Sequence, residues 1–138
     1  MNILIGSDHA GFTLKNKIKE YLTHHSYSII DVGCFNQNSC DYPIIVDELC
    51  TKLKVYDVGI LICGTGIGVS IKANRYKSIR CALCHNVETA ELGRKHNNAN
   101  ILALGSRIVN DEEAFKIVDV FLNTEFEGGR HTNRINLL

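Results

Sequence analysis

A cysteine and three glycines follow an apolar run in the middle of the chain. The segment GILICGTGIG, residues 59–68, ends this run on Cys63 and then places glycine at positions 64, 66 and 68. Closely spaced glycines let backbone N–H groups approach an anion, and a following helix start adds positive potential. A cysteine in such a place holds its thiolate more readily than a free thiol does. The residues therefore predict either a reactive thiolate above an anion-binding loop or a small buried cysteine that closes the strand.

Two other places combine histidine with polar neighbours. Asp8 and His9 follow the first apolar run and could orient a substrate hydroxyl or phosphate, although a cap on the next helix is the simpler interpretation. His96 lies at the expected end of a helix, in the segment RKHNN, where it could carry a proton. The alternative for His96 is a structural contact with the last carbonyl groups of that helix.

The charge balance excludes some classes of partner. The chain of 138 residues carries 15 basic and 15 acidic side chains, so its charge gives no basis for binding nucleic acid or an anionic membrane. Arg107, Arg130 and Arg134 instead offer isolated planar guanidinium groups, which bind phosphate, with a solvated basic tail as the alternative for the last two. No apolar run reaches the roughly 20 residues of a membrane span, and no signal peptide is recognisable, so we expect a cytoplasmic protein.

The six cysteines predict neither disulfides nor a cofactor. In a cytoplasmic protein we expect reduced thiols. The run from Cys81 to His85 matches the haem-attachment pattern C-x-x-C-H, but residues three apart in a strand point to opposite faces of the sheet. No histidine and carboxylate residues show the spacing of a metal site. We therefore expect no metal ion and no other cofactor.

Strand-like and helix-like segments alternate along the chain. This alternation predicts a three-layer α/β sandwich, in which helices cover both faces of a five-stranded parallel sheet, as one domain over residues 1–138. In such sheets ligands bind beyond the carboxyl ends of the strands, which is where most of the unusual residues lie. The expected strands are 2–6, 27–32, 58–63, 79–84 and 100–104, and the expected helices are about 14–22, 44–53, 67–75, 87–96 and 110–123, followed by a tail that is irregular at first.

Six segments, in this order, resemble the type B ribose-5-phosphate isomerases, which belong to one sugar-phosphate isomerase family with the galactose-6-phosphate isomerase subunits. The segments are GSDHAGF, DYP, ILICGTGIGVSIKANR, KHNNAN, LGSR and EGGRHTNRI. The resemblance implies a Rossmann-like fold and a dimer or dimer of dimers. It also implies metal-free interconversion of D-ribose 5-phosphate and D-ribulose 5-phosphate through an enediolate, in the non-oxidative pentose phosphate pathway.

The resemblance also assigns roles to residues. Cys63 matches the catalytic base, and His96 matches the histidine that opens the sugar ring. The site lies between two subunits, with His96 and Asn97 supplied by the neighbour. Thr65 joins the loop N–H groups in stabilising the oxyanion. The residues implied to contact the substrate are Asp8, His9, Tyr42, Gly64, Thr65, Gly66, Ile67, Gly68, Asn97, Arg107, Arg130 and Arg134.

Three alternative functions remain open from the sequence. A galactose-6-phosphate or allose-6-phosphate isomerase would differ in the depth of its pocket, which a sequence does not show. A dinucleotide-dependent oxidoreductase would need a glycine fingerprint after the first strand, and GSDHAG has the wrong spacing. A non-catalytic nucleotide-binding module would leave the combination of Cys63, His96 and the tail arginines unexplained.

Overall fold

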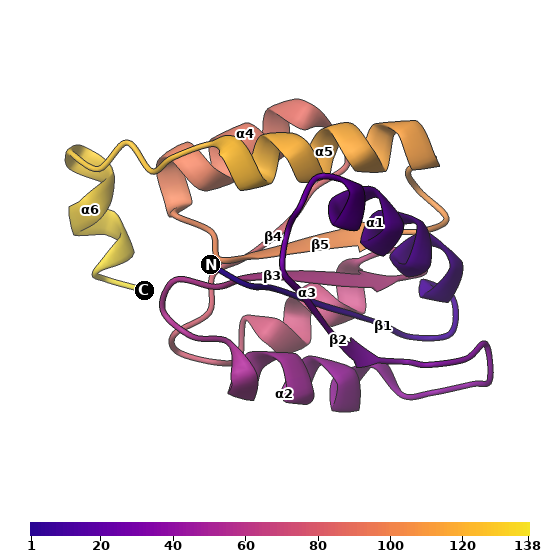
Figure 1. The fold of residues 1–138 in the computed structure, drawn as a ribbon. Coiled ribbons are helices and arrows are strands. Elements are labelled where there is room, and N and C mark those ends of the chain that lie inside the picture. Colours follow the sequence, from indigo (N-terminus) through magenta and orange to yellow (C-terminus); the bar gives the residue numbers. More distant parts are fainter.

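Five parallel strands form one sheet, in the order β2-β1-β3-β5-β4, in a computed structural model that describes residues 1–138. The expected five-stranded parallel sheet is confirmed (Figure 1). Every pairing is parallel because each strand is followed by a helix that returns the chain to the other end of the sheet. The strands are β1 Ile3–Ser7, β2 Ile29–Gly33, β3 Val58–Cys63, β4 Cys81–Leu83 and β5 Ile101–Gly105.

Helices cover both faces of the sheet. Helices α1, α4 and α5 lie on one face, and α2 and α3 lie on the other. Helix α6 belongs to neither layer and contacts the end of α4 (Figure 1). None of them combines the length and the apolar character that a bilayer crossing requires. Their bounds are α1 Phe12–His24, α2 Tyr42–Lys52, α3 Ile67–Ala73, α4 Val87–Asn97, α5 Asp111–Asn123 and α6 Arg130–Ile135.

The sheet packs against its helices through two apolar cores, one on each face. Because side chains alternate along a strand, each strand side chain lies on the side of one of these cores. In β3, Ile60 and Ile62 are buried in the core that includes residues of α1 and α5. Leu61 and Cys63 are buried in the other core, with residues of α2 and α3. Successive strand residues point to opposite faces. Cys63 therefore lies on the same face of the sheet as α3, the helix that begins just after it.

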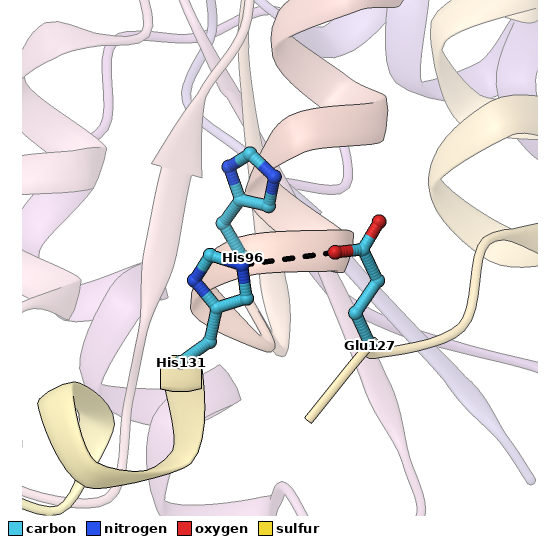
Figure 2. A group of neighbouring side chains, drawn as sticks. All are labelled: His96, Glu127 and His131. Carbon is cyan, nitrogen blue, oxygen red and sulfur yellow. Dashed lines mark ion pairs between the residues drawn. The ribbon is translucent and has the colours of Figure 1, made fainter. Parts of the chain in front are cut away.

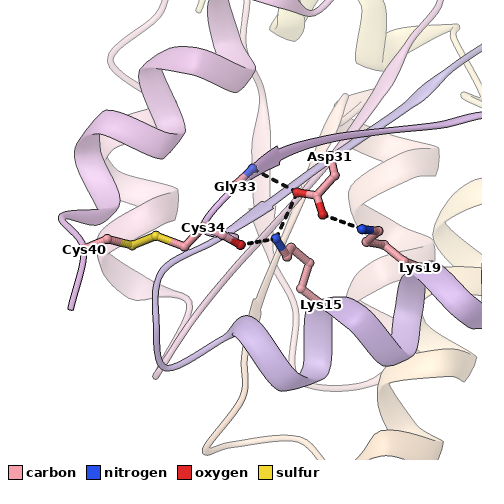
Figure 3. A network of polar contacts seen from close by, with 6 residues as sticks. All are labelled: Lys15, Lys19, Asp31, Gly33, Cys34 and Cys40. Atoms are coloured by element: carbon pink, nitrogen blue, oxygen red, sulfur yellow. Dashed lines mark hydrogen bonds and ion pairs between the residues drawn. A yellow bond between two sulfur atoms is a disulfide. The ribbon is translucent and has the colours of Figure 1, made fainter. Parts of the chain in front are cut away.

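The cysteines differ from expectation at one pair. Cys34 and Cys40 form a disulfide across the exposed loop between β2 and α2, so the expectation that all six cysteines are reduced is wrong for these two (Figure 3). The chain bends at residues 36–38, between the two cysteines. Cys81 and Cys84 pack in the two opposite cores, as the strand argument against the haem pattern predicted.

The tail contains a helix that was not predicted. Gly128 and Gly129 both have positive φ, +67° and +57°, and they turn the chain into α6. This conformation is open to glycine at little cost, whereas other residues rarely adopt it. Arg130 and Arg134 therefore lie on a short helix, where both side chains are exposed.

Candidate functional site

The loop after β3 holds Cys63 against backbone N–H groups. The Gly66 N–H donates a hydrogen bond of 3.1 Å to Cys63 Sγ, and Cys63 is buried. Gly66 has a φ of +78°, and a Cβ on it would lie 2.5 Å from a Leu83 methyl group. Only glycine suits that conformation and that space. The Ile67 N–H donates to Thr65 Oγ1 at 3.2 Å, which leaves the exposed Thr65 hydroxyl proton free to donate elsewhere.

Two side chains expected to contact the substrate flank this loop. A Cβ on Gly64 would lie 2.8 Å from Arg107 Nη1, and a Cβ on Gly68 would lie 2.6 Å from Tyr42 Cζ. The Arg107 guanidinium and the Tyr42 ring thus pack directly on glycine backbone. The backbone N–H of Arg107 also donates a hydrogen bond of 3.0 Å to the Gly64 carbonyl, which connects the segment after β5 to the loop.

Asp8 and His9 lie at the same edge, because β1 is the neighbour of β3. Asp8 is buried, and its Oδ1 accepts a hydrogen bond of 3.0 Å from the Gly11 N–H. Asp8 therefore closes the turn before α1, but the N-cap of α1 is Gly11 and no side chain caps the helix, so the helix-cap interpretation is not confirmed. The exposed His9 accepts a hydrogen bond of 3.4 Å at Nδ1 from the Cys40 N–H, so it touches the loop that leads to Tyr42.

Sequence reasoning missed a buried lysine that supports this loop. Lys15 is fully buried and donates to Asp31 Oδ1 at 2.9 Å and to the Cys34 carbonyl, while Lys19 donates to Asp31 Oδ2 at 2.6 Å (Figure 3). Burial lowers the pKa of Lys15. Burial would raise the pKa of Asp31, but hydrogen bonds from Lys19, Lys15 and the Gly33 N–H bring it below its usual value. The only signal in the sequence was a lysine beside Leu14, on the apolar face of α1.

A second group of candidates lies at the end of α4. Asn98 takes a left-handed conformation with a φ of +45°, and it ends the helix just after His96 and Asn97. These two residues line a cavity of about 370 Å³ together with residues of α6 and the chain end. The full lining is His96, Asn97, Arg130, His131, Arg134, Ile135 and Leu138.

Within one chain the two groups lie at opposite ends of the sheet. Helix α4 runs back from the end of β4 to the start of β5, so His96 lies at the amino edge of the sheet, where α6 also lies (Figure 1). Cys63 lies at the carboxyl edge. One chain therefore does not bring His96, Asn97, Arg130 or Arg134 to Cys63.

A cluster at the amino edge contradicts one expectation. His96 and His131 stack with their ring centroids 4.4 Å apart, and His131 Nε2 lies 3.6 Å from Glu127 Oε2 (Figure 2). Burial lowers the pKa of His131, and His96 and Arg130 lower it further, against the effect of Glu127. The expectation that no histidine and carboxylate residues show metal-site spacing is wrong. The spacing of four between Glu127 and His131 was visible, but the packing of His96 against them was not.

A family model and individual relatives match nearly the whole chain, and all of them indicate the same family. A family model described as Ribose/Galactose Isomerase matches residues 3–138. Ribose-5-phosphate isomerase B of Escherichia coli is 41% identical, over 99% of this chain and 93% of its own length. The Clostridium thermocellum ribose-5-phosphate isomerase B structure superposes with a TM-score of 0.97 at 46% identity, covering 99% and 94% of the two chains. The Mycoplasma genitalium enzyme, solved with bound ribulose-5-phosphate, has a TM-score of 0.90 and 45% identity, covering 99% and 92%.

Proposed function

Since the chain belongs to the ribose/galactose isomerase family, we propose that it interconverts D-ribose 5-phosphate and D-ribulose 5-phosphate as a type B ribose-5-phosphate isomerase. The observation that carries the proposal is the hydrogen bond of 3.1 Å from the Gly66 N–H to Cys63 Sγ. A donor aimed at the sulfur stabilises its anionic form, and a thiolate is the form that accepts a proton from carbon.

The reaction requires a single base that serves two neighbouring carbons. In the open-chain aldose, Cys63 removes the proton from C2, and the electron pair forms the enediolate while the C1 carbonyl oxygen gains negative charge. The thiol then returns the proton to C1, and a proton moves from O2 to O1, which leaves a carbonyl at C2. The free N–H groups of the loop and the Thr65 hydroxyl stabilise the oxyanion at each stage, because they are already oriented before charge develops.

The rest of the site comes from a second copy of the chain. His96, Asn97, Arg130 and Arg134 lie together but far from Cys63 along the sheet, so a complete site requires the amino edge of one subunit to meet the carboxyl edge of another. The arginines then bind the phosphate and position C1 and C2 near the sulfur. His96 opens the ring by moving the O1 hydroxyl proton to the ring oxygen. We therefore place the active sites at the interfaces of a homodimer or homotetramer.

The substrates indicate the compartment and the pathway in which we expect the enzyme to act. Both are small sugar phosphates, whose charge keeps them from crossing lipid bilayers. We place the reaction in the non-oxidative pentose phosphate pathway of the cytoplasm.

The proposal is tested by turnover of ribose 5-phosphate with two single variants. Cys63→Ala should lower kcat by at least ~10²–10⁴-fold, since it removes the acid–base group. Cys84→Ala, which removes a buried thiol at the same edge of the sheet but outside the loop, should retain most activity. A folded Cys63→Ala protein with normal kcat would show that Cys63 is not the catalytic base. Preference for a six-carbon aldose phosphate would change the substrate but not the chemistry.

A mixing experiment tests the shared site. Cys63→Ala and His96→Asn proteins should each turn over ribose 5-phosphate slowly. After subunit exchange, a fraction of interfaces would combine an intact Cys63 with an intact His96, and activity should return. Absence of recovery after proven exchange would place both groups in one subunit.

A further inference from the structure

We propose that His96, Glu127 and His131 form a binding site for a divalent transition-metal ion such as Zn²⁺, and that a metal ion bound there inhibits the isomerase. The binding itself stands on the cluster alone, whereas the inhibition rests on the proposed role of His96 in ring opening. Two imidazoles and one carboxylate are a common zinc donor set, with a fourth position open to water.

The distances allow coordination after a small movement. Each of the three side chains offers a ligand atom, and these atoms all lie within 4.8 Å of one another. Zinc–ligand bonds of about 2.0–2.2 Å in a tetrahedron place ligand atoms roughly 3.3–3.6 Å apart. His131 Nε2 and Glu127 Oε2 are already 3.6 Å apart. The third ligand must come closer by rotation of the His96 and Glu127 side chains, and neither of these side chains is buried.

The backbone holds the three residues in place before any ion binds. The Glu127 N–H donates to the Lys95 carbonyl at 3.1 Å, so the carboxylate is anchored beside the residue that precedes His96. The His131 N–H donates to the Gly128 carbonyl at 3.1 Å, across the turn that the two positive-φ glycines make. His131 itself is only 8% exposed. A site formed this way needs no folding of the chain around the metal.

The charges around the cluster set the kind of site. Glu127 supplies the one negative charge among the ligands, and both histidines line the cavity of about 370 Å³, through which an ion can approach them. Arg130 and Arg134 line the same cavity, and their positive charges oppose a cation. We therefore expect a reversible, inhibitory site rather than a structural one. A metal ion that holds a ring nitrogen of His96 prevents that nitrogen from carrying a proton.

Zinc binding is measured directly, by titration calorimetry on the chain of 138 residues in buffer without phosphate or chelator. The wild-type protein should bind one ion per chain at this site. Glu127→Gln should weaken binding by at least about tenfold, because losing even an outer-shell partner costs about 10–100-fold. Glu125→Gln, at an exposed glutamate two residues earlier, is the matched control and should bind like the wild type. Equal zinc affinity in the Glu127→Gln and wild-type proteins would overturn the site.

Two further measurements show whether zinc binds at this site or at Cys63, and they test metal binding independently of the proposed isomerase activity. Cys63→Ala should bind zinc like the wild type; loss of binding in this variant alone would place the ion on the thiolate and overturn the proposal. Glu127→Gln should keep basal isomerase activity and lose sensitivity to zinc. If the protein does not isomerise ribose 5-phosphate, the calorimetric result still decides whether the metal site exists. Zinc that binds through Glu127 without inhibiting turnover would overturn the inhibitory role.

Discussion

Replacing Lys15 with methionine should destabilise the fold by about 2–3 kcal/mol. Methionine keeps most of the side-chain length, so the loss of packing is small. The loss is electrostatic: Asp31 loses one of its two lysine partners, and the Cys34 carbonyl loses the buried ammonium that donates to it. Removing one partner of a buried pair costs about 3–5 kcal/mol when the other charge is left alone. Lys19 and the Gly33 N–H still serve Asp31, which lowers the expected cost.

The assay is urea unfolding followed by circular dichroism, at one fixed protein concentration, since association of subunits shifts apparent stability. In thermal melts of the same samples, the melting temperature should fall by roughly 8–12 °C, at about 4 °C per kcal/mol for a chain of this size. Lys17→Met is the matched control on the same helix, because Lys17 is half exposed in its 2.6 Å pair with Asp111. Such a pair contributes at most about 1 kcal/mol.

Lys15→Met should also affect the site, because Lys15 supports the loop that touches His9 and leads to Tyr42. We expect KM for ribose 5-phosphate to rise more than kcat falls, since Cys63 and its loop are untouched. Equal unfolding midpoints for Lys15→Met and Lys17→Met would show that the buried network contributes no more than a surface pair, which contradicts the expected loss of about 2–3 kcal/mol.

Four other outcomes are expected. Because the pKa of Asp31 is lowered in the fold, its contribution is present above its unfolded pKa of about 3.9 and is lost as pH falls through the lower folded pKa; the stability gap between wild type and Asp31→Asn should therefore close in acid unfolding curves. Arg130→Ala should weaken binding of ribose 5-phosphate by at least ~1.5 kcal/mol, measured by calorimetry, and an unchanged Kd would exclude a phosphate contact. Mass spectrometry after brief iodoacetamide treatment should find Cys63 alkylated before Cys50 and Cys84, since burial raises the pKa of each of those two thiols to about 11. Exhaustive EDTA treatment should leave turnover intact, and restoration of lost activity by added zinc or magnesium would contradict the thiolate mechanism.

The sequence by itself determined the layers of the fold and the loop after β3. The apolar run 58–63 was predicted with the bounds that the structure shows, because a continuous apolar stretch ended by glycine is typical of a central parallel strand. The left-handed conformation of Gly66 explains why glycine stands at that position of the loop. These features are local, and a few neighbouring residues suffice to specify them.

The sequence predicted the bounds of strands and helices less accurately where the apolar pattern was weak. The fourth strand was expected over 79–84 but pairs only over Cys81–Leu83, because it is an edge strand with a single neighbour. Helix α6 was missed because its six residues carry no apolar periodicity, and its start depends on the turn at Gly128 and Gly129.

Only the tertiary structure decided which residues meet. The burial of Lys15 depends on where β2 lies against α1, and no pattern along the helix shows that. The contact of His96 with Glu127 and His131 depends on the path of the tail past the end of α4. The separation of Cys63 from His96 follows from strand direction, which puts helix ends and strand ends at opposite edges. Such contacts join residues far apart in the chain, and packing of whole elements selects them rather than local preference.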